Sequence, residues 1–283
     1  MKPIVSIFAQ GSMGAATAVR LVENGLEVRT ITTGRSAASI ERAKNAGMRS
    51  VDTEEFIQAD FILSIVPPAE AIPLAKHLAP FLMQSKKKPV YVDLNAINPD
   101  TAMMVAMVLQ STGCTVVDGG IIGGPPRAGY DGPVYYVSGE GADKVNGLAA
   151  YGLKVSVLDG PIGAASALKM SYAGITKGLI AVGSAMILAA TRAGVADALH
   201  AELSASQSGL MNGFTRSIPD MFGKAGRWVA EMEQIAGFAG NSRAEHGLYE
   251  AIAELYSRID EDNNRDKQEI DALGAFVSIQ NKH

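Results

Sequence analysis

The sequence predicts an α/β Rossmann domain followed by an all-α C-terminal domain. Short apolar runs rich in β-branched residues alternate with helical patterns through the first half, which indicates a mostly parallel sheet with helices on both faces. From Gly163 onward the pattern is helical and strands are almost lacking. This change predicts a border near residue 160, with one domain over residues 1–160 and a second over residues 161–283.

The alternation in the first domain resolves into individual elements. The expected strands cover residues 4–9, 27–32, 61–66, 89–94, 114–118 and 134–138. The expected helices cover residues 12–24, 36–46, 69–83 and 99–110, and a glycine follows each of the first two as a stop signal. In the second domain one long helix over residues 163–193 precedes helices over residues 196–211, 216–222, 226–236, 243–258 and 266–279.

Composition excludes several classes of protein. The chain has 283 residues and a formal net charge of -4, whereas a nucleic-acid-binding face would need a basic surplus. Cys114 is the one cysteine, so neither an internal disulfide nor a cysteine-based metal site is expected. The longest apolar stretch, residues 178–190, contains glycine and is short for a membrane span. We expect a cytoplasmic protein without a nucleic-acid, membrane or metal partner.

The first strand leads into a G-x-G-x-x-G fingerprint whose first position is Ala9. Gly11 lets the backbone approach a pyrophosphate, and Gly14 lets the following helix press against the strand. The alternative is a tight turn without a ligand. In the ligand-binding interpretation, the cofactor contacts come from Gln10, Gly11, Ser12, Met13 and Gly14.

The end of the second strand favours one nicotinamide cofactor over the other. An NAD site usually places Asp or Glu here for the ribose hydroxyls, and residues 28–36 contain neither. Thr33, Arg35 and Ser36 could instead hold a 2′-phosphate, which favours NADP(H) over NAD(H). As alternatives, Arg35 is a solvated loop residue and Ser36 caps the next helix.

Two further segments follow strands at the carboxyl edge, where open α/β sheets bind ligands. They contain Val66 and Pro67 in one case and Asn95 in the other. We expect these three residues near the nicotinamide ribose. Ordinary strand-terminating loops are the alternative for each segment.

A glycine-rich segment follows the strand that is expected to end at Asp118. Backbone amides at Gly123 and Gly124 could hold a carboxylate or an oxyanion. Arg127 could pair with an acidic group of the substrate. The alternative is a flexible connection with a solvated arginine.

Lys169 is the main candidate for a catalytic residue. It lies in a helix rich in Gly, Ala and Ser, where burying a charged amine is costly and lowers its pKa toward the range of an acid/base catalyst. Tyr172 and Thr176 follow on the same helix face, and Ala173 leaves room beside them. The alternative is a lysine that extends its ammonium group to solvent.

These motifs, in this order, resemble the β-hydroxyacid dehydrogenase superfamily, which includes 3-hydroxyisobutyrate dehydrogenase and 6-phosphogluconate dehydrogenase. The run from Asp118 to Gly124 is similar to the family's substrate motif Asp-x-Pro-Val-Ser-Gly-Gly. The resemblance implies substrate contacts at Ile122 and the two glycines after it, although Ile122 replaces the serine and supplies no hydroxyl. It also implies that Lys169 is the catalytic lysine, while Ala173 replaces the family's substrate-binding asparagine.

The lysine helix is similar to the run Lys-Met-Val-His-Asn-Gly-Ile-Glu-Tyr-Gly of 6-phosphogluconate dehydrogenase. Tyr172 replaces its histidine, and Thr176 replaces the glutamate that protonates the enediol in that family. A threonine does not serve as such an acid, so 6-phosphogluconate is not the expected substrate. The pattern from Arg227 to Met232 resembles a phosphogluconate-dehydrogenase-like branch of NAD-binding oxidoreductases with a distinctive C-terminal domain.

Together these features predict an NADP-preferring oxidoreductase that transfers a hydride between nicotinamide and a small hydroxyacid, alcohol or carbonyl compound. Lys169 is the expected general acid/base, and Tyr172 or Thr176 the expected hydrogen-bonding partner of the substrate. Two alternatives stay open: an imine reductase on the same scaffold with Tyr172 as proton donor, and an NADP-binding regulator without catalysis. The small-residue helices of the second domain also predict a homodimer.

Overall fold

The computed structural model describes residues 2–8 and 11–279 and divides into two compact units, Met1–Met170 and Ser171–His283. Ala9 and the predicted cofactor contact Gln10 lie outside the described residues. The units divide inside the long helix, whereas the sequence-based border at residue 160 precedes it. The first turns of that helix count with the first unit because they pack on its sheet.

The first unit is built on an 8-stranded sheet with the order β3-β2-β1-β4-β5-β6-β7-β8. The strands are β1 (Ile4–Phe8), β2 (Glu27–Thr30), β3 (Arg49–Ser50), β4 (Phe61–Ser64), β5 (Val90–Asp93), β6 (Val116–Ile122), β7 (Val134–Ser138) and β8 (Lys154–Val157). All neighbours pair in parallel except β6 and β7, which are antiparallel. The predicted α/β Rossmann architecture is confirmed.

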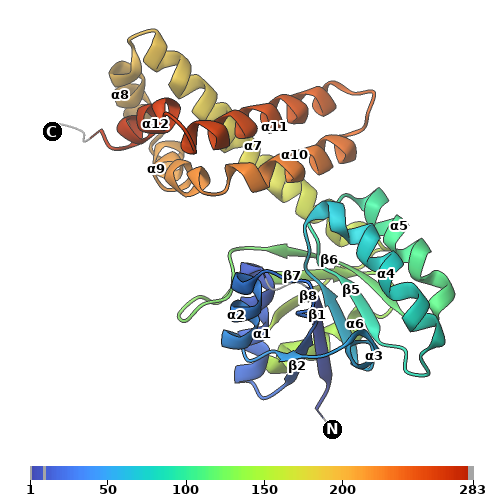
Figure 1. The fold of residues 1–283 in the computed structure, drawn as a ribbon. Coiled ribbons are helices and arrows are strands. Elements are labelled where there is room, and N and C mark those ends of the chain that lie inside the picture. The colour runs from blue at the N-terminus through green and yellow to red at the C-terminus, as the bar shows by residue number, and fades with distance from the viewer. Residues whose placement is uncertain (1, 9–10, 280–283) are drawn as a thin grey trace. The chain divides into compact units, whose positions relative to one another are not determined.

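Helices cover both faces of this sheet, with α1 and α2 on one side and α4 and α5 on the other (Figure 1). The helices are α1 (Ser12–Glu23), α2 (Ala37–Asn45), α3 (Thr53–Phe56), α4 (Ala71–Gln84), α5 (Pro99–Leu109) and α6 (Ala142–Asn146), with short 3-10 turns η1 (Pro68–Glu70), η2 (Gln110–Thr112) and η3 (Gly147–Tyr151).

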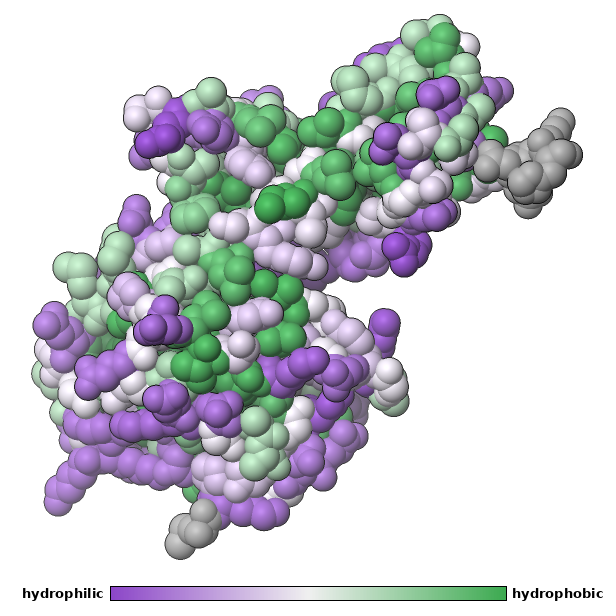
Figure 2. Space-filling view, turned by 180° about the vertical axis from the view of Figure 1, so that it is seen from behind, coloured by the Kyte–Doolittle hydropathy of each residue, from purple (hydrophilic) through white to green (hydrophobic). Residues whose placement is uncertain are grey.

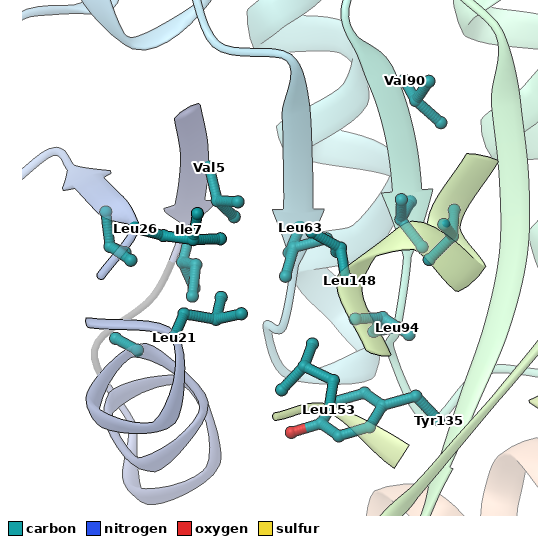
Figure 3. Packing of buried hydrophobic residues seen from close by; sticks show 14 of the residues in the cluster. Val5, Ile7, Leu21, Leu26, Leu63, Val90, Leu94, Tyr135, Leu148 and Leu153 are labelled. Carbon is teal, nitrogen blue, oxygen red and sulfur yellow. The ribbon is translucent and has the colours of Figure 1, made fainter. Parts of the chain in front are cut away.

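Alternate side chains of each central strand enter two separate cores. Val5, Ile7 and Leu63 pack with Leu21 of α1 on one face (Figure 3), whereas Ile62 belongs to the core on the other face. Burial on both faces explains why these strands appear in the sequence as nearly continuous apolar runs. This double packing holds the strand ends that the functional site uses.

The second unit is helical, as predicted. It contains most of α7 (Ala164–Arg192), followed by α8 (Ala196–Ser206), α9 (Ser208–Phe222), α10 (Ala225–Ala239), α11 (Ala244–Asn263) and α12 (Gln268–Val277). Gly183 of α7 faces the ring of Phe214, which occupies the place of a β-carbon, so the glycine lets α9 approach α7 closely. Helices α10 and α11 lie side by side (Figure 1).

Helix α7 also has the length and composition of a membrane-spanning helix, because its mean hydropathy over an 18-residue window reaches 1.6. The apolar stretch of residues 178–190 is short for a membrane span, whereas the whole helix Ala164–Arg192 is long enough. Of the most apolar window, 44% is buried within the described part of the protein.

Several expected boundaries are wrong, among them the end of α11, which lies at Asn263 instead of residue 258. Strand β6 does not end at Asp118 but continues to Ile122, because these residues pair with β7. The helix break expected after Met211 lies instead at Gln207, between α8 and α9. The short elements β3, α6 and β8 were not predicted.

Candidate functional site

The carboxyl ends of four parallel strands form one row in the first unit. Strand pairing aligns Phe8 of β1 with Ser64 of β4, Ser64 with Asp93 of β5, and Asp93 with Asp118 of β6. The chain leaves the sheet at this row in β1, β4 and β5, whereas β6 continues to Ile122. Ligands of open α/β sheets bind outside this edge. The predicted cofactor contacts within the described residues follow β1, β2, β4 or β5, so the fold brings these residues to one edge of the sheet.

Among the described residues, the space beside Gly11, the residue before α1, is open. Gly11 is the N-cap residue of α1, and its backbone is extended, with φ -69° and ψ 176°. A β-carbon added to Gly11 would meet no heavy atom within 4 Å. Neither strain nor packing therefore requires a glycine here, and the open space suits an approaching phosphate. The amides of Ser12, Met13 and Gly14 belong to the first helical turn, where N–H groups have no acceptor within the helix.

A pocket of about 260 Å³ brings together predicted contacts from two different loops. Arg35 comes from the connection after β2, while Val66 and Pro67 follow β4. The Arg35 guanidinium lies over the ring of Phe8, with 4.8 Å between its central carbon and the ring centroid. This pocket has the position and the flat apolar wall that suit the adenosine end of a dinucleotide.

The predicted 2′-phosphate contacts are all exposed. Thr33, Arg35 and Ser36 lie on the surface of the connection between β2 and α2. Ser36 is the N-cap residue of α2, and its hydroxyl oxygen accepts the N–H of Ser39 at 3.3 Å. Ser36 therefore has the capping role that was the alternative to a 2′-phosphate contact. Its hydroxyl also donates to the hydroxyl of Ser39 at 3.1 Å, so its contact with a phosphate stays a prediction.

Asn95 points into the protein at the same edge. Its side-chain oxygen accepts the N–H of Val66 at 2.6 Å, and its amide group donates to the hydroxyl of Ser64 at 2.9 Å. Asn95 thereby fixes the start of the loop after β4 to the end of β5. The side-chain oxygen and the amide group of Asn95 both form hydrogen bonds within the protein, so its contact with the cofactor stays a prediction.

Asp93 and Asp118 are both buried acids of this edge. Burial, and the negative charge of Asp118 on the neighbouring strand, raise the pKa of Asp93 to about 7. One oxygen accepts the N–H of Asn95 at 3.0 Å, and among the described residues the other has no hydrogen-bond partner. The protonated form of Asp93 is therefore favoured up to neutral pH.

Strand β6 carries two adjacent glycines that face opposite sides. A β-carbon added to Gly119 would lie 2.6 Å from Leu94, and one added to Gly120 would lie 2.8 Å from Cβ of Lys169 and 3.0 Å from the carbonyl oxygen of Ala165. Gly120 thus lets α7 cross β6 at close range, with the base of the Lys169 side chain resting on it. Lys169 is half-buried. Gly120 follows Asp118, the residue of β6 in the row of strand ends. The base of the Lys169 side chain therefore lies at the same edge of the sheet as the predicted cofactor-binding segments after β1, β2, β4 and β5.

Asp118 anchors the helix that carries Lys169. One carboxylate oxygen accepts the N–H groups of Gly163 and Ser166 at 2.9 and 3.0 Å and the hydroxyl of Ser138 at 3.1 Å. The other accepts the hydroxyl of Ser166 at 2.5 Å. A carboxylate at a helix N-terminus satisfies free N–H groups and complements the helix dipole. Sequence reasoning missed Ser138 and Ser166, because no local pattern links residues so far apart in the chain.

The predicted substrate contacts at the end of β6 and in the segment after it lie in different surroundings. Ile122 ends the strand, and Gly123 has a positive φ of 122° and packs against Tyr130. Gly124 faces open space. Arg127 is exposed and lies over the Tyr130 ring, 5.4 Å from its centroid, in a pocket of about 590 Å³ along the outer side of α1. Lys169 is not among the residues that line that pocket.

Tyr172 and Thr176 belong to the second unit, where both line a pocket of about 710 Å³ between α7 and α9. The Tyr172 side chain is half exposed. The Thr176 hydroxyl donates to the carbonyl oxygen of Tyr172 at 2.8 Å, so only its lone pairs are left for a ligand. Thr176 can accept a hydrogen bond but cannot donate a second one.

A second lysine of α7, Lys177, has 15% of its side-chain surface exposed. Lys177 forms a short ion pair with Glu231 of α10, and its ammonium lies 4.6 Å from the centroid of the Trp228 ring. The Tyr256 hydroxyl donates to the carbonyl oxygen of Lys177 at 2.6 Å. This cluster gives the pattern around Trp228 and Glu231 a physical role, which is to join α10 and α11 to α7.

The strand-end row and the open glycine turn define a Rossmann-type dinucleotide-binding protein. The family model described as the NAD binding domain of 6-phosphogluconate dehydrogenase matches residues 5–148, about half of the chain. The chain belongs to this family of NAD-binding dehydrogenases, and a nicotinamide dinucleotide is its cofactor. A domain of unknown function (DUF1932) matches residues 190–259 in the helical unit. Lys169 lies between the two matched ranges.

The chain is similar to proteins with and without an assigned activity. An uncharacterized 28.5 kDa protein of Methanothermus fervidus is 28% identical over 187 residues, which is 65% of this chain and 70% of the relative. The solved structure of a conserved protein of unknown function, described as similar to 3-hydroxyacid dehydrogenases, covers 95% of this chain with 98% of its own length, 24% identity and a TM-score of 0.71.

Solved structures of two enzyme types share the fold. The 3-hydroxyisobutyrate dehydrogenase of Mycobacterium tuberculosis matches 98% of this chain with 98% of its own, at 17% identity and a TM-score of 0.66. An imine reductase of Myxococcus stipitatus, in complex with NADP+, matches 98% of this chain with 100% of its own, at 17% identity and a TM-score of 0.61. A variant of that reductase is in complex with NAD+. The fold is therefore shared by hydroxyacid dehydrogenases and imine reductases and does not separate the two reactions or the two cofactors.

Proposed function

We propose that the protein is an NADP-preferring oxidoreductase that acts on a hydroxyacid, alcohol or carbonyl compound, with Lys169 as its general acid/base. The observation that carries this proposal is the position of the Lys169 stem over Gly120, beyond the row of strand ends. The turn at Gly11 opens at the same edge of the same sheet. An amine at this edge suits proton transfer to a substrate that faces a nicotinamide ring.

The bound nicotinamide supplies or accepts the hydride. Lys169 takes the hydroxyl proton of the substrate during oxidation and returns it during reduction. Three hydrogen bonds to Asp118, from Gly163 and Ser166, hold the start of α7 and so support the base of the Lys169 side chain on β6. Tyr172 donates a hydrogen bond to the substrate, and Thr176 accepts one.

The preference for NADP(H) rests on the connection after β2. Residues 28–36 contain no acid that would repel a 2′-phosphate, and Thr33, Arg35 and Ser36 are exposed there. Arg35 stacks on Phe8 in a way that also suits stacking on an adenine ring, with its charge available to a phosphate. A cytoplasmic location, where NADP(H) is available, belongs to the same proposal and is supported by the soluble dehydrogenase fold of the family.

An imine reductase is the second candidate. The Tyr172 hydroxyl lines a pocket in the helical unit and could protonate an imine nitrogen. Imine reductases and a reductive aminase also share the fold, at TM-scores of 0.62 and 0.58. In this reaction Lys169 would orient the substrate instead of exchanging a proton with it.

Hydride transfer from NADPH carrying deuterium at C4 tests the proposal. We expect deuterium on the carbinol carbon of the product, and a kcat/KM for NADPH that exceeds that for NADH by about tenfold or more, the value of one good charge-assisted contact. Transfer to cyclic imines alone would overturn the carbonyl assignment in favour of the imine reductase. Cofactor binding without transfer to either class would overturn catalysis.

A further inference from the structure

We propose that the pocket between α7 and α9 binds a substrate with a medium-length apolar body and a distal anionic group, such as a carboxylate. The proposal rests on the proposed oxidoreductase function and narrows its substrate class. It excludes a short hydroxyacid as the preferred substrate. Every residue that lines the pocket belongs to the helical unit.

The size and walls of the pocket favour an apolar body. Its volume is about 710 Å³, within the range of about 300–1,000 Å³ that drug-sized ligands fill. Leu179 and Ile180 of α7 and Leu210 and Phe214 of α9 provide apolar walls. A compound with only a few carbon atoms would leave most of this surface wet, whereas a chain of about eight carbons would cover it.

Two glycines keep the pocket open at a cost to the helix. Gly209 and Gly213 lie one turn apart in α9, and both line the pocket. A β-carbon added to either would meet no heavy atom within 4 Å, so no packing contact requires them. Gly213 lies inside α9, where glycine is destabilising relative to alanine, whereas Gly209 lies in the first turn. Open volume for a ligand is what these glycines provide, and this observation is independent of the pocket's apolar lining.

The charges around the pocket favour an anion. Arg216 is exposed at the pocket, and its Nε donates to the carbonyl oxygen of Asn212 at 3.3 Å. Among the described residues no carboxylate forms an ion pair with Arg216. Asp220 also lines the pocket, but Lys224 lies 2.5 Å from both of its oxygens and neutralises it. The unmatched positive charge suits a carboxylate or a phosphate.

The same pocket contains the two side chains proposed to contact the reacting group. Tyr172 and Thr176 share it with Leu179, and all three follow Lys169 on α7. A substrate with its carbonyl group beside Tyr172 would lay its apolar body along Leu179 and Ile180. Its anionic end would then be available to Arg216.

Calorimetric titration of the full-length protein with three small probes tests the proposal without requiring turnover. Octanoate has the apolar body and the charge, butyrate has only the charge, and 1-octanol has only the body. We expect octanoate to bind on the order of tenfold or more tightly than butyrate, because four further methylene groups are buried. We expect octanoate to bind about fivefold more tightly than 1-octanol, which is the upper range for an exposed ion pair. Equal affinities of octanoate and butyrate, or of octanoate and 1-octanol, would overturn the corresponding half of the proposal.

Two variants locate the binding. Gly213→Leu fills the pocket and favours the helix, so it should keep the fold and abolish octanoate binding. Arg216→Ala should make the affinities for octanoate and 1-octanol equal. Arg192→Ala, at the exposed end of α7 and outside the pocket, should leave the preference for octanoate unchanged. Octanoate binding that survives in a folded Gly213→Leu variant would overturn the assignment to this pocket.

The outcomes separate this proposal from the proposed function. Selective octanoate binding by a protein that transfers no hydride would uphold the pocket and overturn the oxidoreductase. Hydride transfer to short hydroxyacids by a protein that does not bind octanoate would overturn the pocket and uphold the oxidoreductase.

Discussion

Glycine residues of the first unit serve different purposes, and the surroundings of an added side chain tell them apart. At Gly120 a β-carbon would collide with the base of Lys169, so this glycine sets the distance between α7 and β6. At Gly11 and Gly124 the same atom would enter open space. Packing against the described residues does not require a glycine at position 11, and we propose that a bound ligand does.

Gly11→Ser tests this distinction. Serine is favoured at a helix N-cap, so the free energy of unfolding should change by less than about 0.5 kcal/mol or rise slightly. The added side chain occupies the space of the pyrophosphate, so NADPH affinity should fall by about tenfold or more. Thermal unfolding and NADPH fluorescence titration measure the two quantities, with Gly124→Ala as a control expected to change neither. Unchanged NADPH affinity in Gly11→Ser would contradict the assignment of this turn.

Asp93 makes the stability of the protein depend on pH in a defined window. Its pKa is raised from 3.8 to about 7, so between these values the native state holds a proton that the unfolded state releases. Stability is therefore lost as the pH rises through the window. Asp93→Asn keeps the shape of the side chain and removes the titrating group. The free energy of unfolding of the variant, relative to that of wild type, should therefore increase from near zero at about pH 4 to at most about 4 kcal/mol at about pH 8. Urea unfolding across this range provides the measurement, and parallel curves for the two proteins would refute the prediction.

At the scale of elements, the Lys177–Glu231 pair joins α7 to α10. Both side chains are largely buried, with 15% and 10% of their surfaces exposed. Lys177→Met should destabilise the protein by about 3 kcal/mol or more, because Glu231 keeps a buried charge without its partner. Combining it with Glu231→Leu should recover most of this loss, since an apolar pair of similar volume replaces the ion pair. Urea unfolding of the single and double variants measures the coupling, and strictly additive losses would show that the two side chains act independently.

Regular elements with strong periodicity were predictable, and elements fixed by distant partners were not. An apolar run predicts the strand that contains Val5 and Ile7, and a long uninterrupted helical pattern predicts α7. The extension of β6 through Gly120 was missed because glycine is rare within strands, and only pairing with β7 explains it. The break at Gln207 was misplaced because neither a glycine nor a proline marks it.

The candidate site shows the same division. The Gly11 turn and the grouping of Arg35 with Pro67 follow from positions after parallel strands. The anchoring of α7 by Asp118 and the pairing of Lys177 with Glu231 join residues that lie far apart in the chain. No local pattern predicts such contacts, since they depend on how the elements pack.

At the scale of the whole molecule, α7 has an apolar face that a second copy could cover. Ile175, Val182 and Met186 are 71%, 51% and 58% exposed and lie seven and four residues apart, on one side of the helix. Apolar side chains also reach the surface of the helical unit in the view of Figure 2. We propose that this face contributes to a homodimer, because exposed apolar faces of this kind mark contact surfaces.

Light scattering coupled to size-exclusion chromatography measures the assembly. Wild type should elute with the mass of two chains, and Val182→Asp should elute with the mass of one, since a buried unpaired charge opposes association. Met107→Asp changes an exposed apolar residue of the first unit and should remain dimeric. A monomeric wild-type protein would exclude the homodimer.

The rate of hydride transfer in Lys169→Met tests the central claim most directly. The substitution keeps an apolar stem over Gly120 and removes the amine, so the fold and NADPH affinity should persist while kcat falls by about 10²–10⁴-fold, the contribution of a general acid/base. Lys144→Ala, at an exposed position of α6, provides the control and should retain the wild-type rate. A folded Lys169→Met protein that binds NADPH and keeps the wild-type kcat would contradict the acid/base role of Lys169.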